Sequence, residues 1–226
     1  MSNSELLLFF SGTYEKSLNG KMLYRNYKLP EDEVISYIDR ISNYPFLDFL
    51  DIINGYNDVS YLTYDDVFQF SSFEDATCNI CKVIKNAGDE GYSCIEIGKM
   101  LENDGKQRKD GAYTKYGENH AKTACQLGLL HSMSNVYFLT CIGACVNDLP
   151  IDISEKFISR ICLRNNLIKK IIRRIHTAGQ ASYFSEVDFL CQSTAERRSS
   201  NVKTVIRYIA THADTEGFFE ALSFQK

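Results

Sequence analysis

Two short stretches carry side chains that could hydrogen-bond to a nucleic acid. The first lies within residues 118–127 and combines amide, imidazole, hydroxyl and ammonium groups: Asn119, His120, Lys122, Thr123 and Gln126. Asn and Gln can pair bidentately with adenine, and Lys and Thr can contact phosphate. A single histidine does not indicate a catalyst. The pattern therefore predicts contacts with base edges and with the sugar–phosphate backbone.

The second stretch begins at residue 193 and is richer in cations: Ser193, Thr194, Arg197, Arg198, Ser199, Lys203 and Arg207. Arg197 and Arg198 fall in the first turn of an expected helix, where the helix macrodipole disfavours cations unless an anion neutralises them. Lys203 and Arg207 extend the same charge toward the end of the helix, where the dipole also favours cations, so the dipole is a second explanation for this later pair. We therefore expect the two early arginines to face phosphate.

A polar, glycine-bearing segment, 103–117, holds four more cations: Lys106, Arg108, Lys109 and Lys115. We expect it to be a loop that either follows a phosphate backbone or is a solvated insertion. Charge is uneven along the chain, since residues 1–90 hold seven basic and fifteen acidic side chains whereas residues 155–207 hold eleven and four. Phosphate would repel the acidic part. The C-terminal part is therefore the one predicted to face a nucleic acid.

Hydrophobic spacing predicts a mainly helical chain around these stretches. Ser93 and Glu96 have the spacing of a capping box, which marks the start of a helix. Leu6 to Phe10 are expected as a strand or arm, and residues 58–70 as a strand or irregular cover. A hairpin is expected over 132–139. Helices are expected from Pro30 to Pro45 and over 46–53, 71–88, 94–101, 118–127, 184–190 and 194–211. A further helix is expected over 154–177, with a bend near 165–166.

The order of residues 117–149 resembles that of winged helix-turn-helix proteins, which bind DNA. An expected helix, GENHAKTACQLGLL, is followed by HSMSNVYFLTCIGACVNDL, an expected hairpin and a Leu-Thr-x-x-Gly helix start. Cys191 to Ile209, with Ser-Thr-x-x-Arg-Arg and then Thr204-Val205, is similar to helix-turn-helix segments of bacterial restriction and related DNA-associated proteins.

The resemblance implies a fold that is mainly α with small β-hairpin wings (α+β), in which tandem winged-helix or helix-turn-helix units follow an N-terminal helical segment. It divides the chain into an acidic, aromatic-rich N-terminal segment (1–70), a winged-helix domain (71–150) and a second helix-turn-helix domain (151–226). The long segment 103–117 departs from the simplest winged-helix pattern.

These observations predict binding to double-stranded DNA through both units. The protein would be a transcriptional regulator or the DNA-recognition component of a bacterial or phage restriction or defence system. Two alternatives stay open: an assembly subunit of a larger complex, and a restriction-type endonuclease with a degenerate metal site. An assembly subunit, or a homodimer, would use the N-terminal segment, where aromatic residues are candidate anchors: Tyr56, Tyr61, Tyr64 and Phe68.

Patterns for catalysis or cofactors are missing from the sequence, and no catalytic residue, metal or cofactor is expected. A magnesium nuclease needs acidic residues that converge on a metal, commonly with a strand-borne lysine. Asp65-Asp66 and Glu186-x-Asp188 lack such a lysine and are expected to be caps or solvated carboxylates. Cys78-x-x-Cys81 and Cys141-x-x-x-Cys145 have the spacing of zinc ligands. Because both pairs lie in apolar, apparently helical stretches, reduced and mostly buried thiols are the simpler expectation.

The composition, with 44% hydrophobic and 24% charged residues, is that of a soluble globular protein. The apolar run Leu6 to Phe10 follows Glu5 and is too short for a signal peptide or a membrane span. We therefore expect a cytoplasmic protein that does not enter a membrane.

Overall fold

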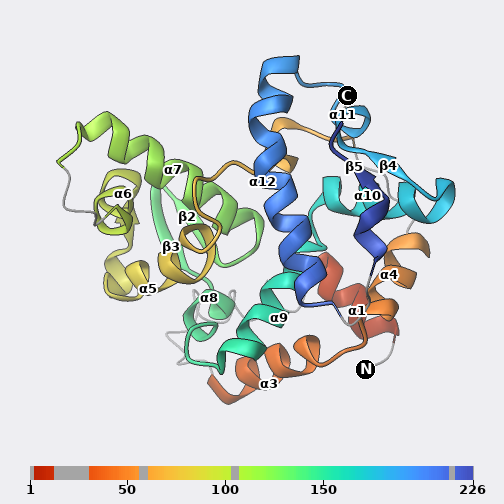
Figure 1. Cartoon of the computed structure of the whole chain (residues 1–226). Helices are drawn as coiled ribbons and strands as arrows, with labels where there is room; N and C mark the ends of the chain where they lie inside the picture. Colours follow the sequence, from red (N-terminus) through yellow and green to blue (C-terminus); the bar gives the residue numbers. More distant parts are fainter. Residues whose placement is uncertain (1–2, 13–30, 56–60, 103–106, 214–216, 226) are drawn as a thin grey trace. The chain divides into compact units, whose positions relative to one another are not determined.

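The chain divides into two compact units (Figure 1). The computed structural model describes residues 3–12, 31–55, 61–102, 107–213 and 217–225. Unit 1 comprises Met1–Gly12, Arg40–Phe68 and Glu155–Lys226, and unit 2 comprises Thr13–Asp39 and Gln69–Ser154. The chain passes from one unit to the other between Phe68 and Gln69 and between Ser154 and Glu155. These two positions lie close to the domain boundaries predicted near residues 70 and 150. The predicted N-terminal domain is not separate, because parts of residues 1–70 belong to each unit.

Residues 69–154 of unit 2 combine helices with one small sheet. The predicted capping box is confirmed at the start of the helix Cys94–Leu101, where Glu96 Oε2 accepts a hydrogen bond from Ser93 N at 2.8 Å. In chain order the elements are the π-helical turn η2 (Asp75–Asn79), α5 (Ile80–Lys85), η3 (Gly88–Glu90), β1 (Tyr92–Ser93), α6 (Cys94–Leu101), α7 (Asp110–Gln126), β2 (Leu130–Met133), β3 (Val136–Leu139) and α8 (Cys141–Cys145).

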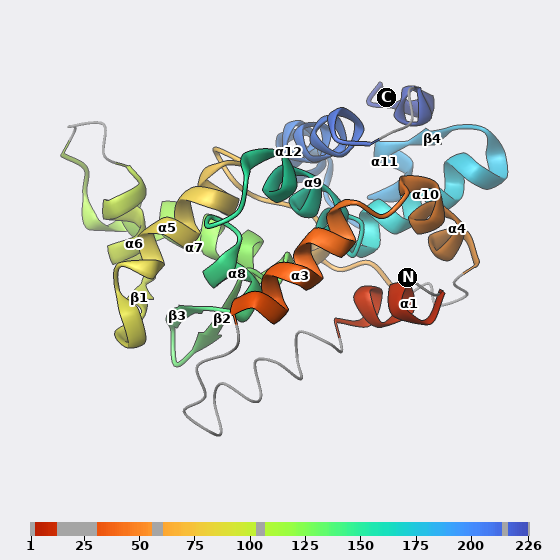
Figure 2. The ribbon, with the colours of Figure 1, turned by 90° about the horizontal axis from the view of Figure 1, so that it is seen from below.

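The sheet of unit 2 is antiparallel, with the strand order β1-β3-β2. Strand β2 pairs with β3 from Leu130 opposite Leu139 to Met133 opposite Val136. Ser134 and Asn135 connect the two strands with φ angles of 52° and 64°. Positive φ at both central residues is typical of the tight turn that suits twisted hairpins. The predicted hairpin is therefore confirmed and can be followed in Figure 2.

Helices α6 and α7 cross where each has a glycine. A Cβ atom on Gly98 would lie 2.0 Å from Tyr113 O, and a Cβ atom on Gly117 would lie 1.9 Å from Cys94 O. Either distance is far below van der Waals contact. The two backbones can therefore approach this closely only because neither glycine has a side chain.

Helix α7 begins at Asp110, eight residues before the predicted start at Glu118. The prediction of a loop over 103–117 is therefore wrong from residue 110 onward, where the chain is helical. The buried face of the helix consists largely of small residues, with Gly117, Ala121 and Ala124 beside Tyr113. Such a face lacks the large apolar side chains by which a helix is usually recognised in a sequence.

Unit 1 is also mainly helical. Two helices pass from unit 2 into unit 1: α3 (Glu31–Ser42) and α9 (Ile151–Cys162). The helices predicted after Pro30, after Pro45 and over 194–211 are confirmed, and the predicted bend near Asn165 is a break between two helices. The remaining elements are α1 (Asn3–Ser11), α4 (Phe46–Gly55), η1 (Tyr64–Asp66), α10 (Asn166–Ala178), β4 (Ala181–Ser182), α11 (Tyr183–Glu186), α12 (Gln192–Thr211), η4 (Phe218–Ala221) and β5 (Leu222–Ser223).

One prediction of a strand in unit 1 is wrong. Residues Leu6 to Phe10 lie in helix α1, in which Leu6 and Phe9 are fully buried at a helical spacing of three. In the described part of residues 151–226 the strands β4 and β5 pair in parallel, with Ala181 opposite Leu222. The coarser prediction, a mainly helical protein with a small antiparallel sheet, is confirmed.

Aromatic residues of the N-terminal segments form part of the core of unit 1. Arg160 of α9 is fully buried, with its Cζ atom 4.9 Å from the ring centroid of Phe46 and 5.4 Å from that of Phe49. Arg164 Cζ lies 4.0 Å from the ring centroid of Phe9. These cation–π contacts attach α4 to α9 and α1 to the turn between α9 and α10. They explain why the aromatic segment does not form a domain of its own.

A buried carboxylate connects α11 with α10. Glu186 is 2% exposed, and its oxygens lie 3.1 Å from Lys170 Nζ and 3.1 Å from Arg174 Nε. The prediction of a cap or solvated carboxylate is therefore wrong for Glu186. Burial of a charge is costly unless cations compensate it, and here two cations do so.

All eight cysteines are free thiols, of which Cys81, Cys141, Cys145 and Cys162 are buried and Cys191 is exposed. Within the described ranges, no three or more His, Cys, Asp and Glu side chains are grouped so as to hold a metal ion. None of the helices in those ranges has the length and apolar character that crossing a bilayer requires.

Candidate nucleic-acid interface

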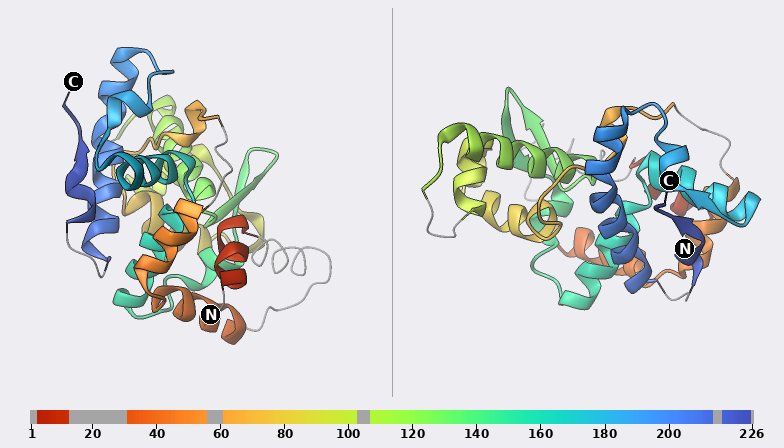
Figure 3. Two further views of the ribbon diagram at one scale, coloured as in Figure 1. Left: turned by 90° about the vertical axis from the view of Figure 1, so that its right-hand side faces the viewer. Right: turned by 45° about the horizontal axis from the view of Figure 1, so that its top comes forward.

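Helix α12, whose course is seen in Figure 3, is the longest described helix. Polar residues are exposed along one of its faces. The helix has 20 residues and buries Ala195, Val202, Val205, Ile206 and Ile209 on one face. On the other face, exposed residues follow one another at spacings of four and three, which aligns them on a helix. We call this set the α12 stripe: Ser193, Arg197, Ser200, Thr204, Arg207 and Thr211.

The exposed cations of α12 have no acidic partner in the part of the chain that the structure describes. Arg197, Lys203 and Arg207 form no ion pair there. Lys203, which flanks the stripe, lies 5.8 Å from the ring centroid of Phe224. Glu196 also flanks the stripe and accepts a hydrogen bond from Gln192 Nε2 at 3.0 Å. The surface therefore offers guanidinium, ammonium and hydroxyl groups, which are the usual partners of phosphate oxygens.

Three residues predicted to contact DNA from this helix turn away from the stripe. Arg198 is half-buried, and its Nη1 donates to Tyr64 O at 2.8 Å and to Val67 O at 3.1 Å. Ser199 is half-buried and donates to Glu196 O. Thr194 is half-buried with its Oγ1 3.1 Å from Cys191 Sγ. The prediction that Arg198 faces phosphate is wrong, because its guanidinium group is used inside unit 1.

The thiol of Cys191 marks the N-terminal end of α12. Cys191 is the N-cap residue and is exposed. Hydrogen bonds with Thr194 and Ser193, and the nearby charge of Arg197, lower the pKa of this thiol to about 7. The groups that favour the thiolate, the hydroxyl of Thr194 and the guanidinium of Arg197, also favour other negative charge at this end of the helix.

Two residues predicted to lie on the outer face of α7 are buried. His120 is 0% exposed, and its Nδ1 lies 2.7 Å from Tyr116 O while its Nε2 lies 3.3 Å from both Ser71 N and Ser72 N. These partners require the neutral tautomer in which Nδ1–H donates and Nε2 accepts. Burial lowers the pKa of His120 from its usual value. The prediction that His120 reaches DNA is therefore wrong.

Thr123 is 1% exposed and donates from Oγ1 to Gln69 O at 3.2 Å. The prediction of an outward Thr123 is wrong for the same reason as for His120. Both side chains attach α7 to the segment that precedes η2. Asn119 is half-buried and Gln126 is exposed, so these two amides keep some access to solvent.

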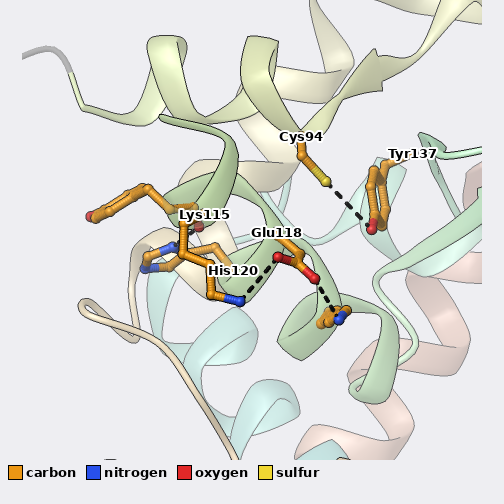
Figure 4. A network of polar contacts seen from close by, with 7 residues as sticks. Cys94, Lys115, Glu118, His120 and Tyr137 are labelled. Atoms are coloured by element: carbon orange, nitrogen blue, oxygen red, sulfur yellow. Dashed lines mark hydrogen bonds and ion pairs between the residues drawn. The ribbon is translucent and has the colours of Figure 1, made fainter. Parts of the chain in front are cut away.

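The cations on the outer face of α7 are paired with an acid on the same face (Figure 4). Glu118 lies between Lys115 and Lys122, with distances of 3.1 Å to Lys115 Nζ and 2.7 Å to Lys122 Nζ. The hydrogen bond from Lys122, followed by that from Lys115, lowers the pKa of Glu118. One of the two positive charges is therefore compensated inside the helix, which weakens this face as a phosphate site.

The other cations predicted near α7 are placed as follows. Arg108 pairs with Glu102 at 2.7 Å, and its backbone N–H donates to Tyr113 Oη. Lys109 is exposed and is the N-cap residue of α7. Lys106 lies outside the described residues. Of the sixteen residues predicted from the sequence, those that share one exposed and uncompensated surface are Ser193, Arg197, Lys203 and Arg207.

Sequence reasoning missed the hydrogen bonds that attach η1 (Tyr64–Asp66) to α12 and to the start of α10. Asn165 Nδ2 donates to Asp66 O at 2.9 Å, and Asn166 Nδ2 donates to Asp66 Oδ1 at 2.9 Å. Together with the bonds from Arg198, these hold η1 within unit 1. Side-chain contacts between residues about one hundred positions apart leave no periodic signal in a single sequence, so no pattern could have indicated them.

No protein-family model matches this chain, and no match was found among curated proteins or among solved structures.

Proposed function

We propose that this protein binds double-stranded DNA and that the α12 stripe is its main contact surface. The observation that carries the proposal is the exposed face of α12, on which Arg197, Lys203 and Arg207 are not neutralised by any described acid. Such binding would serve a transcriptional regulator or the DNA-recognition component of a restriction or defence system.

The size of the stripe suits a groove of duplex DNA. Arg197 and Arg207 are ten residues apart, which corresponds to ~15 Å along a helix axis. A major groove is about 12 Å wide and admits an α-helix. Long side chains at both ends of the stripe can therefore reach the phosphates on either side, while the hydroxyl groups of Ser200 and Thr204 lie between them.

The connection into α12 supports a helix-turn-helix in unit 1. The short helix α11 precedes α12, and Tyr183 Oη donates to Ala195 O at 2.9 Å. This buried hydrogen bond fixes the start of α12 on α11. In helix-turn-helix proteins the second helix enters the major groove with its N-terminal residues near the bases. In unit 1 those residues include Ser193 and Arg197.

The order of elements in unit 2 supports a winged helix there. A helix, a strand, two helices and a two-stranded hairpin follow one another, and the strands join in one antiparallel sheet. In such a unit α7 would be the recognition helix and the hairpin the wing. The exposed residues of that hairpin, Ser132 to Asn135, include no cation. We therefore assign unit 2 a weaker contribution to phosphate binding than α12.

The proposal is tested by removing two cations from the stripe. Arg197→Ala/Arg207→Ala should weaken binding of a labelled random-sequence duplex roughly tenfold or more at moderate salt, because two phosphate contacts are lost. Fluorescence anisotropy of the full chain measures this affinity. The fold should be unaffected, since both side chains are exposed.

The matched control is Arg40→Ala/Lys85→Ala, which removes the same net charge. Arg40 and Lys85 are exposed, and each already pairs with an acid, Glu5 and Asp148 respectively. This control should bind duplex nearly as well as the parent chain. Equal losses in both double variants would mean that net charge and not the α12 stripe governs binding, and the proposal would fail.

A second candidate function is a protein contact through unit 1. Leu7 and Leu8 of α1 and Leu47 of α4 are 40%, 47% and 57% exposed, and α1 packs against α4. This apolar surface favours a homodimer or a partner subunit. Of the anchors predicted there, Tyr61 and Tyr64 are exposed, Phe68 is buried and Tyr56 lies outside the described residues. Size-exclusion chromatography over a concentration series tests self-association.

A further inference from the structure

Two exposed aromatic rings lie in contact near the first turns of α12. Tyr64 belongs to η1, and Phe189 lies between α11 and α12. Their ring centroids are 6.2 Å apart and the rings are nearly perpendicular, at 85°. Tyr64 is 53% exposed and Phe189 is 37% exposed. A single exposed aromatic side chain is common on protein surfaces, but two that contact each other form an apolar surface suited to a ligand.

The position of this aromatic pair is fixed by hydrogen bonds. Arg198 Nη1 donates to the carbonyl oxygens of Tyr64 and Val67, and Arg198 Cζ lies 5.8 Å from the Tyr64 ring centroid. Asn165 and Asn166 hold Asp66, two residues after Tyr64. In the sequence Arg198 follows Arg197 of the stripe, but its own side chain turns away from the stripe. The aromatic pair is therefore held against the Arg198 side of α12, and the backbone of Tyr64 needs no rearrangement before a ligand binds.

The charge around the pair discriminates between parts of a nucleotide. Asp65 is exposed next to Tyr64 and Asp188 is exposed next to Phe189, and negative charge at these two positions disfavours a phosphate near the rings. An uncharged base is not disfavoured in this way. The phosphates that flank such a base can instead meet Arg197, which has no acidic partner among the described residues.

We propose that Tyr64 and Phe189 bind an unstacked base of a DNA whose backbone contacts the α12 stripe. In an intact duplex the faces of the bases are covered by their neighbours, so an aromatic ring can stack only on a base that has left the helix or lies in a single strand. The preferred substrate is therefore a duplex with an unpaired end, bulge or overhang. This inference rests on the proposed function and narrows its substrate class.

The experiment compares a blunt duplex with the same duplex carrying a short single-stranded overhang that contains 2-aminopurine. The parent chain should bind the overhang probe about fivefold or more tightly than the blunt one, and the fluorescence of 2-aminopurine should fall as the base stacks. Tyr64→Ala/Phe189→Ala should abolish both the preference and the quenching and leave the blunt affinity unchanged. Tyr64→Phe, which keeps the ring, should retain both effects.

Controls separate this inference from the function on which it rests. Leu47→Ala removes another exposed apolar side chain from unit 1 and should retain the preference. Arg197→Ala/Arg207→Ala should weaken binding to both probes. Tyr64→Ala leaves the carbonyl oxygen that Arg198 binds, so loss of the fold is not expected. An unchanged circular dichroism spectrum checks this.

Two results would overturn the inference in different ways. Binding of both probes with equal affinity, or a preference that survives Tyr64→Ala/Phe189→Ala, rejects base stacking and leaves DNA binding intact. An apolar segment of a protein would then be the remaining occupant for the aromatic pair. Failure of the parent chain to bind either probe rejects the inference together with the proposed function.

Discussion

At the scale of single residues, burial decides which of the predicted contacts can reach a ligand. His120, Thr123 and Arg198 are polar residues in promising positions, but each makes hydrogen bonds inside its own unit. Arg197, one residue before Arg198, is exposed on α12 and pairs with no described acid. Neighbours in sequence point about 100° apart on a helix, so the two adjacent arginines have different roles.

The neutral state of His120 predicts that stability depends on pH. The unfolded chain takes up a proton at this histidine near the usual pKa of 6.5, whereas burial lowers the pKa of the folded form. The unfolded state therefore binds more protons just below pH 6.5, and the free energy of unfolding falls as the pH drops through this range. Urea denaturation between about pH 7.5 and pH 5.5 measures the effect.

His120→Gln removes the titrating group and should flatten this dependence. Burial also lowers the pKa of His131 and His212, so the parent and the variant must be compared at each pH. The part of the slope that the variant abolishes belongs to His120. An identical pH dependence in the two proteins would show that His120 is not held neutral by its surroundings.

At the scale of elements, the crossing of α6 and α7 depends on the absence of two side chains. Gly98→Ala or Gly117→Ala should each lower the free energy of unfolding by about 1–3 kcal/mol or more, because the new Cβ atom would overlap a backbone carbonyl and force the helices apart. Urea denaturation with circular dichroism detection measures this loss.

Gly111 supplies the matched control on the same helix. A Cβ atom there would meet no atom within 4 Å. Gly111→Ala should therefore leave stability unchanged or raise it by up to ~1 kcal/mol, because alanine favours the helix more than glycine does. If Gly98→Ala and Gly117→Ala lowered the free energy of unfolding no more than Gly111→Ala does, the result would contradict the close approach of the α6 and α7 backbones.

These elements show what a single sequence can predict here. Helices α4 and α12 and the β2–β3 hairpin are encoded locally, by apolar side chains at regular spacing and by turn residues, and they were predicted close to their observed positions. The first turns of α7 were missed because glycine and alanine form its buried face. The parallel pair β4–β5 and the aromatic pair of Tyr64 and Phe189 join distant segments, so local patterns cannot reveal them.

At the scale of the whole molecule, charged residues differ in whether they are exposed or buried and paired or unpaired, and this matters more than the segment of the chain in which they lie. The sequence suggested an acidic N-terminal part and a basic C-terminal part. Unit 1 combines pieces of both and holds thirteen basic and thirteen acidic residues, so it has no net formal charge. Buried or paired groups such as Arg160 and Glu186 account for some of them. Among the described residues of unit 1, Arg197, Lys203 and Arg207 are exposed cations of α12 that form no ion pair.

The most direct test of DNA binding through α12 is the salt dependence of affinity for a random duplex. Three cations that each displace one counterion predict a slope of about −2.7 in a plot of log K against log salt concentration. In Arg197→Ala/Arg207→Ala the slope should fall to about −0.9, because only Lys203 remains. A slope near zero in the parent chain, or the same slope in both proteins, would contradict a role for the α12 stripe in holding the DNA backbone.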